Sequence, residues 1–410
     1  MQVEGKTADS KDWLNRNVVG MGLTSFLSDA CHEMATTVLP GFLAVIGASP
    51  SALGMIEGVS DAISSFVKLW GGWISDTVGH RKILVSIGYL LTGISQSFFA
   101  FALTWHLVIV GRIVGWFGRG FRGPIRDAML ADSIEHTVRG KAFGFHRAGD
   151  TVGAIVGPLL GVWFLSLWHS ELGDDPSLPF RNIFLVTLIP GILSAVVFFV
   201  MIDEKRRLKN HTLKFWSTIT SLPGGFKRYL LGVGIFGIGD FAPTLLILAA
   251  TSLLQNEYGI FHAAQLAGLM YIVRNVSYSA ASFPVGALSD RIGRIPILIA
   301  GYVLAPITII GFMFAFLFDW TNIYYLFFLF ILAGIFIAVE DTLEGAITAD
   351  FIPSEIRGIG MGVLGTVNGI GDCAASITVG FLWTLFSPVA AFGFAALSMS
   401  IGAFVLIKCR

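Results

Sequence analysis

Two short charged motifs occur twice in this chain, once in each half of the sequence. Residues 72–82 read GWISDTVGHRK and residues 286–294 read GALSDRIGR, and each motif separates two long apolar segments. In addition, Asp132 and Asp350 are each preceded by Ala and followed seven residues later by Arg-Gly. Charged links at equivalent places in two apolar halves are typical of a duplicated bundle of membrane-spanning helices, whose binding site lies between the halves.

The composition and the apolar segments agree with a membrane protein. Of the 410 residues, 54% are hydrophobic and 13% are charged, whereas soluble domains contain about 25% charged residues. A helix needs about 20 mostly apolar residues to cross a bilayer. We therefore predict an all-α membrane protein with twelve transmembrane helices in two pseudo-symmetric six-helix halves. The predicted spans are residues 18–47, 52–75, 83–104, 106–131, 140–168, 181–202, 228–255, 262–288, 295–318, 322–350, 357–386 and 388–408.

The longest link, residues 203–227, divides the chain into an N-terminal half, 1–202, and a C-terminal half, 228–410. Lys and Arg gather in this link, in the other even-numbered links and at both termini, whereas the odd-numbered links contain only Arg181. Because basic residues stay on the cytoplasmic side, both termini are predicted to be cytoplasmic. We expect a multi-pass protein of the cytoplasmic (inner) membrane of a bacterium.

The sequence contains no phosphate-binding loop and no other catalytic motif, so we expect neither an enzyme nor an ATP-driven pump, and no cofactor. The formal net charge is zero, so we expect no nucleic-acid partner. The expected partners are the lipid bilayer, a small-molecule substrate and protons, and we expect a monomer.

The repeated motifs resemble those of the major facilitator superfamily over the whole chain. Residues 72–82 are similar to the family's signature between its second and third helices, although Thr77 replaces the usual basic residue. An acid at a helix end and an Arg on the adjoining link can hold two helix ends together, which implies a gating role. The gating residues predicted from the two copies are Asp76, Gly79, Arg81, Asp290, Arg291, Gly293 and Arg294.

Two further segments resemble functional motifs of this superfamily. Residues 111–120 are similar to its helix-4 motif, in which an Arg, here Arg112, is tied to proton transfer. Residues 153–161 are similar to the G-x-x-x-G-P-x-x-G motif of antiporter branches, which assigns a gating role to Gly157 and Pro158. This motif favours export over import, although its small residues would suit close helix packing in any such protein.

Four arginines form a stripe along one face of the predicted helix 106–131: Arg112, Arg119, Arg122 and Arg126. Charges inside a bilayer cost at least about 2.5–3.5 kcal/mol each, so they must line a cavity or pair with one another. We predict that Arg119 and Arg122 contact an anionic group of the substrate and that Arg126 acts as a gate. Alternatively, each Arg neutralises a carboxylate of the first two helices, where Asp29, Glu33, Glu57 and Asp61 are candidates.

Several acids could bind the coupling proton or the substrate. Asp29 or Glu33 held by Arg112 or Arg119 would suit proton coupling, as would Asp150 beside Arg147. In the second half, mostly acidic residues predict a site for a mixed-charge solute, unless they pair internally through Arg274. The predicted substrate-binding residues are Arg119, Arg122, Arg147, Asp240, Arg274, Glu340, Glu344 and Asp372.

These observations favour secondary active transport of a small polar or charged organic solute by alternating access, with proton-coupled export by antiport. The alternative is proton-coupled uptake of an organic anion or a siderophore. A divalent metal exporter, with ligands at residues 29–33 and 372–373, is a weaker alternative, since no metal-ligand spacing is repeated. A receptor or assembly protein without transport activity would not need so many charges in its spans.

Overall fold

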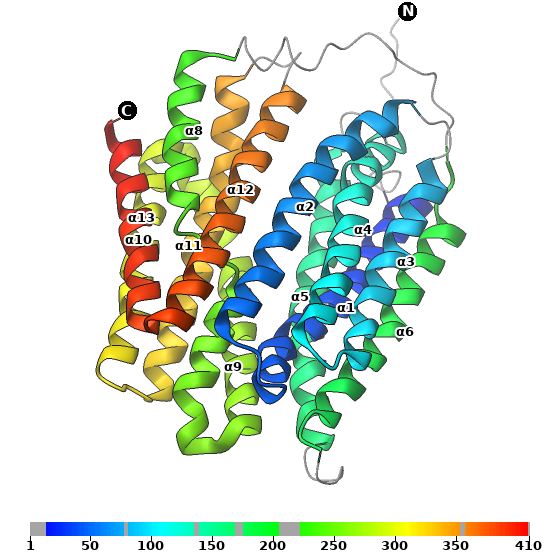
Figure 1. Cartoon of the computed structure of the whole chain (residues 1–410). Helices are drawn as coiled ribbons and strands as arrows, with labels where there is room; N and C mark the ends of the chain where they lie inside the picture. Colours follow the sequence, from blue (N-terminus) through cyan, green and yellow to red (C-terminus); the bar gives the residue numbers. More distant parts are fainter. Residues whose placement is uncertain are drawn as a thin grey trace, which may run out of the picture.

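The computed structural model describes residues 14–77, 81–134, 139–168, 175–204, 222–352 and 357–408. The elements of the first half are α1 (Arg16–Val45), α2 (Pro50–Thr77), α3 (Arg81–Phe98), the 3-10 helix η1 (Phe99–Phe101), α4 (Trp105–Asp132), α5 (Arg139–Trp168) and α6 (Leu178–Met201). Those of the second half are α8 (Gly224–Gly237), α9 (Pro243–Ile292), α10 (Arg294–Leu317), α11 (Ile323–Phe351), α12 (Arg357–Leu385) and α13 (Pro388–Lys408). Figure 1 shows the two sets of helices side by side.

The predicted all-α architecture is confirmed, and most predicted spans match an observed helix to within a few residues. The seventh span differs. The predicted helix 228–255 is interrupted, because α8 ends at Gly237 and α9 begins at Pro243. Proline cannot continue a helix from the preceding turn, but it suits a first helical position. α9 consists of two helices that meet at Gly259, where φ is 74°, a conformation that glycine adopts readily, so the break predicted between residues 255 and 262 is present.

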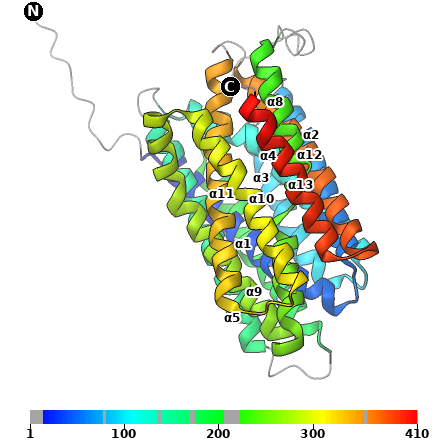
Figure 2. The same ribbon diagram turned by 90° about the vertical axis from the view of Figure 1, so that its left-hand side faces the viewer.

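Among the described residues, six helical segments are long and apolar enough to cross a membrane by length and composition alone: residues 81–101, 142–168, 178–201, 294–317, 323–351 and 388–408. The helices outside this set, α1, α2, α4, α9 and α12 among them, contain most of the charged residues considered below. Apolar side chains such as Ile189, Phe199 and Leu397 are exposed on the outer helices, as lipid-facing side chains are. In Figure 2, α10 and α13 lie in front of α2, α3 and α4.

The two halves pack together at one side of the molecule and diverge at the other. We call the side where α8 begins and α13 ends the terminal side, and the opposite one the far side. Near the far side a Cβ on Gly58 would lie 2.7 Å from the carbonyl oxygen of Cys373, and one on Gly380 would lie 2.7 Å from that of Pro50. Glycine therefore lets α2 and α12 touch. Toward the terminal side the ends of these two helices separate (Figure 1).

Candidate functional site

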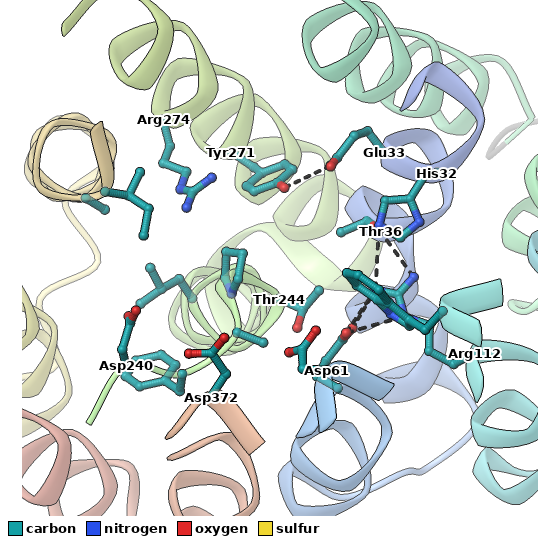
Figure 3. A pocket seen from close by; sticks show the side chains of 18 of the residues that line it. His32, Glu33, Thr36, Asp61, Arg112, Asp240, Thr244, Tyr271, Arg274 and Asp372 are labelled. Carbon is teal, nitrogen blue, oxygen red and sulfur yellow. Dashed lines mark hydrogen bonds and ion pairs between the residues drawn. The ribbon is translucent and has the colours of Figure 1, made fainter. Parts of the chain in front are cut away.

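Two neighbouring cavities, of about 310 and 280 Å³, lie between the two halves. They share the residues Glu33, Arg119, Tyr271, Arg274 and Ile337. The larger cavity is bounded by α1, α2, α4, α9, α11, α12 and the interruption at residues 238–242 (Figure 3). Charged helices thus meet around a single polar region inside the bundle.

Arg112 of α4 is fully occupied by an ion pair within the first half. Its Nη2 atom lies 2.8 Å from Oε1 and 3.0 Å from Oε2 of Glu57 on α2, and Thr36 accepts a longer hydrogen bond. The two charged side chains are only 1% and 3% exposed. Of the candidate partners on the first two helices, the structure pairs Arg112 with Glu57 rather than with Asp29 or Glu33, so this arginine joins α4 to α2.

Arg119 is the arginine of α4 that both cavities expose. Its Nη2 atom lies 3.1 Å from Oδ1 of Asp29, and both residues line the smaller cavity. The second guanidinium nitrogen, Nη1, is buried and has no hydrogen-bond partner among the described residues. Arg119 therefore neutralises a helix-1 carboxylate and still has a free donor. An anionic ligand group could accept a hydrogen bond from that donor.

Arg122 and Arg126 lie away from both cavities. Arg122 donates hydrogen bonds to Ser28 and Thr92 and stacks 3.9 Å above the ring of Tyr89. Arg126 pairs with Asp127 at 2.9 Å. The prediction that Arg122 contacts substrate is therefore not supported. The four arginines do share one face of α4. Arg112 and Arg119 on that face line the cavities, whereas Arg122 packs against α3.

The helix-1 carboxylates Asp29 and Glu33 line the cavities, and their role in proton coupling stays a prediction. Glu33 accepts a 2.8 Å hydrogen bond from the hydroxyl of Tyr271 on α9, which joins the two halves inside the cavity (Figure 3). Close by, Asn275 of α9 donates a 3.0 Å hydrogen bond to the carbonyl of Ala154 on α5. Glu33 thus takes part in the contact between the halves, whereas Asp29 is neutralised within its own half.

A histidine that the sequence did not single out lies beside the predicted pair of Arg147 and Asp150 on α5. Nδ1 of His146 lies 3.6 Å and Nη1 of Arg147 lies 3.8 Å from Asp150. The second ring nitrogen of His146 lies 2.6 Å from the hydroxyl of Ser25 on α1. Arg147 and Asp150 line the smaller cavity. The four-residue spacing of His146 and Asp150 places them on one face of a helix, and this spacing could have indicated the pair from the sequence.

The acidic residues of the second half separate into two groups. Asp240, Asp372 and Arg274, for which substrate contact is predicted, line the larger cavity. Glu344 does not, because it accepts hydrogen bonds from Tyr302 and Asn368 within its own half and is 3% exposed. Glu340 is also absent from both linings, and its Oε2 atom is buried without a hydrogen-bond partner among the described residues. Substrate contact by Glu340 and Glu344 is therefore not supported.

Other lining residues were not predicted as site residues. Asp61 lies one turn after Glu57 on α2, and Asp341 lies next to Glu340 on α11. Both were recognisable as charges within spans. The aromatic and hydroxyl groups gave no signal, because such residues are frequent throughout the chain: Trp116, Phe241, Thr244, Tyr271, Tyr278 and Phe336.

Within each half, the two charged motifs are joined by an ion pair on the terminal side. Arg81 lies 3.0 Å from Asp132 at the end of α4, and Arg294 lies 2.6 Å from Asp350 near the end of α11. Gly293, between α9 and α10, has a φ of 106°, which favours glycine. Arg291 is exposed. Gly79 and the side chains of Asp76 and Asp290 lie outside the described residues, so their gating role stays a prediction.

The predicted gating pair on α5 packs inside the first half. A Cβ on Gly157 would lie 2.5 Å from the carbonyl oxygen of Ala30, and one on Gly153 would lie 2.6 Å from that of Phe26. Pro158 follows directly within the same helix. Because these contacts join α5 to α1, they set the shape of the first half rather than the contact between the halves.

The comparisons with known proteins agree with this geometry. The model of the Major Facilitator Superfamily matches residues 21–260 and 229–410. The chain belongs to this superfamily. It is 31% identical to an uncharacterised MFS-type transporter of Methanocaldococcus jannaschii, over 96% of this chain and 95% of that protein. It is 27% identical to the multidrug resistance protein MdtG of Escherichia coli, over 72% of this chain and 71% of that protein.

Solved structures show the same fold at low sequence identity. The nucleoside transporter NupG superposes with a TM-score of 0.74 at 14% identity, covering 96% of this chain and 98% of that chain. An inward-facing bacterial homologue of the lysosomal transporter Spinster gives 0.71 at 17% identity, covering 96% and 94%. The protein is therefore a multi-pass membrane transporter of the superfamily and not an enzyme, and its fold implies a small-molecule substrate.

Proposed function

We propose that this protein exports a small organic solute bearing a cationic group, and often an anionic one, in exchange for protons. The observation that supports this proposal is the charge balance of the two cavities. Four arginines line them, namely Arg112, Arg119, Arg147 and Arg274. Twice as many acids do so, namely Asp29, Glu33, Glu57, Asp61, Asp150, Asp240, Asp341 and Asp372.

An excess of carboxylates in a membrane cavity requires positive charge from elsewhere. Each buried and unpaired charge costs several kcal/mol, so the surplus acids favour protons or a cationic group of the solute. Since both neutralise the same oxygens, binding of one weakens binding of the other. That mutual exclusion is the thermodynamic requirement for exchange. Arg119 and Arg274, which line both cavities, are the candidates for an anionic group.

The proposed direction rests on orientation and on similarity. If the basic links lie in the cytoplasm, the side where the halves diverge faces the cytoplasm, and the cavity is loaded from there. The protein would then lie in a cytoplasmic membrane with both termini inside. Similarity to MdtG, a multidrug resistance protein, supports export.

Proton-coupled uptake of an anion is a second candidate, and the ion pair of Arg119 with Asp29 favours it. Protonation of Asp29 would release Arg119, whose Nη2 lies 3.1 Å from it, to bind an anion. Proton and anion would then bind together, which is the requirement for symport.

Flux measurements in membrane vesicles of both orientations distinguish these functions. With everted vesicles and an acidic lumen, we expect exported solutes to enter while protons leave, so the lumen becomes more alkaline. For symport, solute added to right-side-out vesicles would instead draw protons inward. Solute movement without any proton movement in either orientation would contradict the proposal.

Substitution of the helix-1 acids tests which carboxylate couples proton and solute. Asp29→Asn and Glu33→Gln, the neutral forms, are expected to fail at gradient-driven accumulation while solute-for-solute exchange persists. If both variants accumulate solute normally, the coupling group lies elsewhere, and Asp150→Asn is the next variant to measure, because Asp150 lines the smaller cavity.

A further inference from the structure

We propose that one wall of the larger cavity is a binding site for the ammonium group of an amine. We call it the amine subsite; it consists of Asp61 of α2, Asp240 of the interruption, Asp372 of α12 and Thr244 of α9. This inference rests on the proposed function only in taking the cavity as the place where solute binds. It adds the chemical class of the solute and the residues that select it.

Three carboxyl groups from three separate elements surround this part of the cavity. Figure 3 shows Asp61 and Asp372 extending toward each other from opposite helices, with Asp240 on the same side as Asp372. The charges of Asp61 and Asp240 both act on Asp372. α9 begins at Pro243, directly after the interruption that contains Asp240.

None of these three acids forms an ion pair within the part of the chain that the structure describes. Arg112 and Arg119 of the same cavity are already paired with Glu57 and Asp29. Arg274 donates to its neighbour Asn275, and Lys68 lies two helical turns from Asp61. The subsite is therefore acidic without a basic side chain bound to it.

Thr244 provides an independent sign of a missing ligand. Its side chain lies in the first turn of α9, lines the cavity and is 1% exposed. Its hydroxyl oxygen has no hydrogen-bond partner among the described residues. Buried hydroxyl groups are nearly always hydrogen-bonded, and an ammonium group offers three donors to such an oxygen and to carboxylates.

The surroundings favour an organic amine over a metal ion. Among the described residues, no group of three or more His, Cys, Asp or Glu side chains is close enough together to hold a metal. Phe241, Phe336 and Leu246 line the same cavity, and such side chains pack against the apolar part of an amine. The preferred ligand therefore joins an ammonium group to an aromatic or branched aliphatic body.

Binding of three matched probes to the purified full-length protein in nanodiscs tests the subsite. Phenethylamine is compared by calorimetry with 2-phenylethanol and 3-phenylpropionate, which replace the ammonium group by a neutral and an anionic one. We expect phenethylamine to bind at least about tenfold more tightly than either, since a charge-assisted hydrogen bond has that effect on affinity.

The variants separate local from general effects. Asp61→Asn and Asp372→Asn should each weaken phenethylamine binding about tenfold, and the nearly isosteric Thr244→Val should weaken it by a smaller factor. The matched control is Asp319→Asn, since Asp319 is exposed between α10 and α11 and has a φ of 49°, which Asn tolerates.

Several results would overturn the subsite. They are no measurable amine binding, equal binding of the amine and the alcohol, and unchanged affinity in both aspartate variants. The proposed function is judged separately: proton release driven by a non-amine solute would uphold exchange while the subsite fails. Amine binding without any proton movement in vesicles would uphold the subsite while proton exchange fails.

Discussion

Both halves of the protein place an arginine against an aspartate at the same point of their repeated links. Arg81 pairs with Asp132 in the first half, and Arg294 pairs with Asp350 in the second. The cavity walls of the two halves have no such correspondence. In the first half Arg112 is paired with Glu57, whereas in the second half Asp372 forms no ion pair among the described residues.

This difference separates two tasks. The ion pairs of the links join helix ends within each half, a task that both halves share. In the cavity walls Arg112 and Arg119 are paired with Glu57 and Asp29 of the first half, whereas the acids of the amine subsite form no ion pair among the described residues. If this comparison is right, a substitution that breaks the buried pair of Arg112 and Glu57 should act on folding, and substitutions of the unpaired acids of the amine subsite should act on ligand binding.

The largest effect is expected for Arg112→Met. It leaves Glu57, which is 3% exposed, as an unpaired buried charge, and breaking such a pair costs about 3–5 kcal/mol. Thermal unfolding in detergent should show a large loss of stability, and the double variant Arg112→Met/Glu57→Gln should recover most of it. A single variant as stable as the wild type would show that this pair does not stabilise the first half.

The second largest effect is expected for a substitution at the contact between α2 and α12, and it concerns transport. In Gly58→Ala the new Cβ would lie 2.7 Å from the carbonyl oxygen of Cys373, which forces α2 and α12 apart at a cost of about 1–3 kcal/mol. We expect transport to fall at least tenfold in folded protein. Gly365→Ala on α12 is the control, because nothing lies within 4 Å of its Cβ. Equal transport by both variants would show that close approach at Gly58 is not needed.

The two link ion pairs are expected to differ in strength despite their common geometry. Arg81 and Asp132 are 5% and 26% exposed, whereas Arg294 and Asp350 are 34% and 60% exposed. Double-mutant cycles with Ala should give a coupling energy of about 1–2 kcal/mol for the first pair and below about 1 kcal/mol for the second. A stronger coupling in the second half would contradict the order inferred from burial.

The smallest change in stability is expected for Asp372→Asn. This acid has no ion pair to lose among the described residues, so the shift in unfolding free energy should stay within about 0.5 kcal/mol or be stabilising. Thermal unfolding without ligand measures it. A loss comparable to that of Arg112→Met would mean that the second half is held together by its charges in the same way as the first.

The site was only partly predictable from the sequence. Asp29, Glu33, Arg119, Asp240, Arg274 and Asp372 do line the cavities, because a charge within a predicted span must face a cavity or a partner. Arg122, Glu340 and Glu344 were assigned to substrate on the same grounds, yet they lie outside both linings. The sequence could not show whether such a charge faces a cavity or a hydrogen-bond partner. The partners of Arg122 and Glu344 come from distant segments of the chain, namely Ser28, Thr92, Tyr302 and Asn368.

The sequence by itself determined the number and order of most helices, the duplication and the family. These features depend on local properties, since the bilayer sets the length of each apolar segment and excludes charge from it. Only the tertiary structure decided which carboxylate each arginine meets, where the halves touch and that the seventh span is interrupted beside Asp240. Those outcomes depend on how helices from distant parts of the chain pack, and a spacing along one helix determines a face but not the partner opposite it.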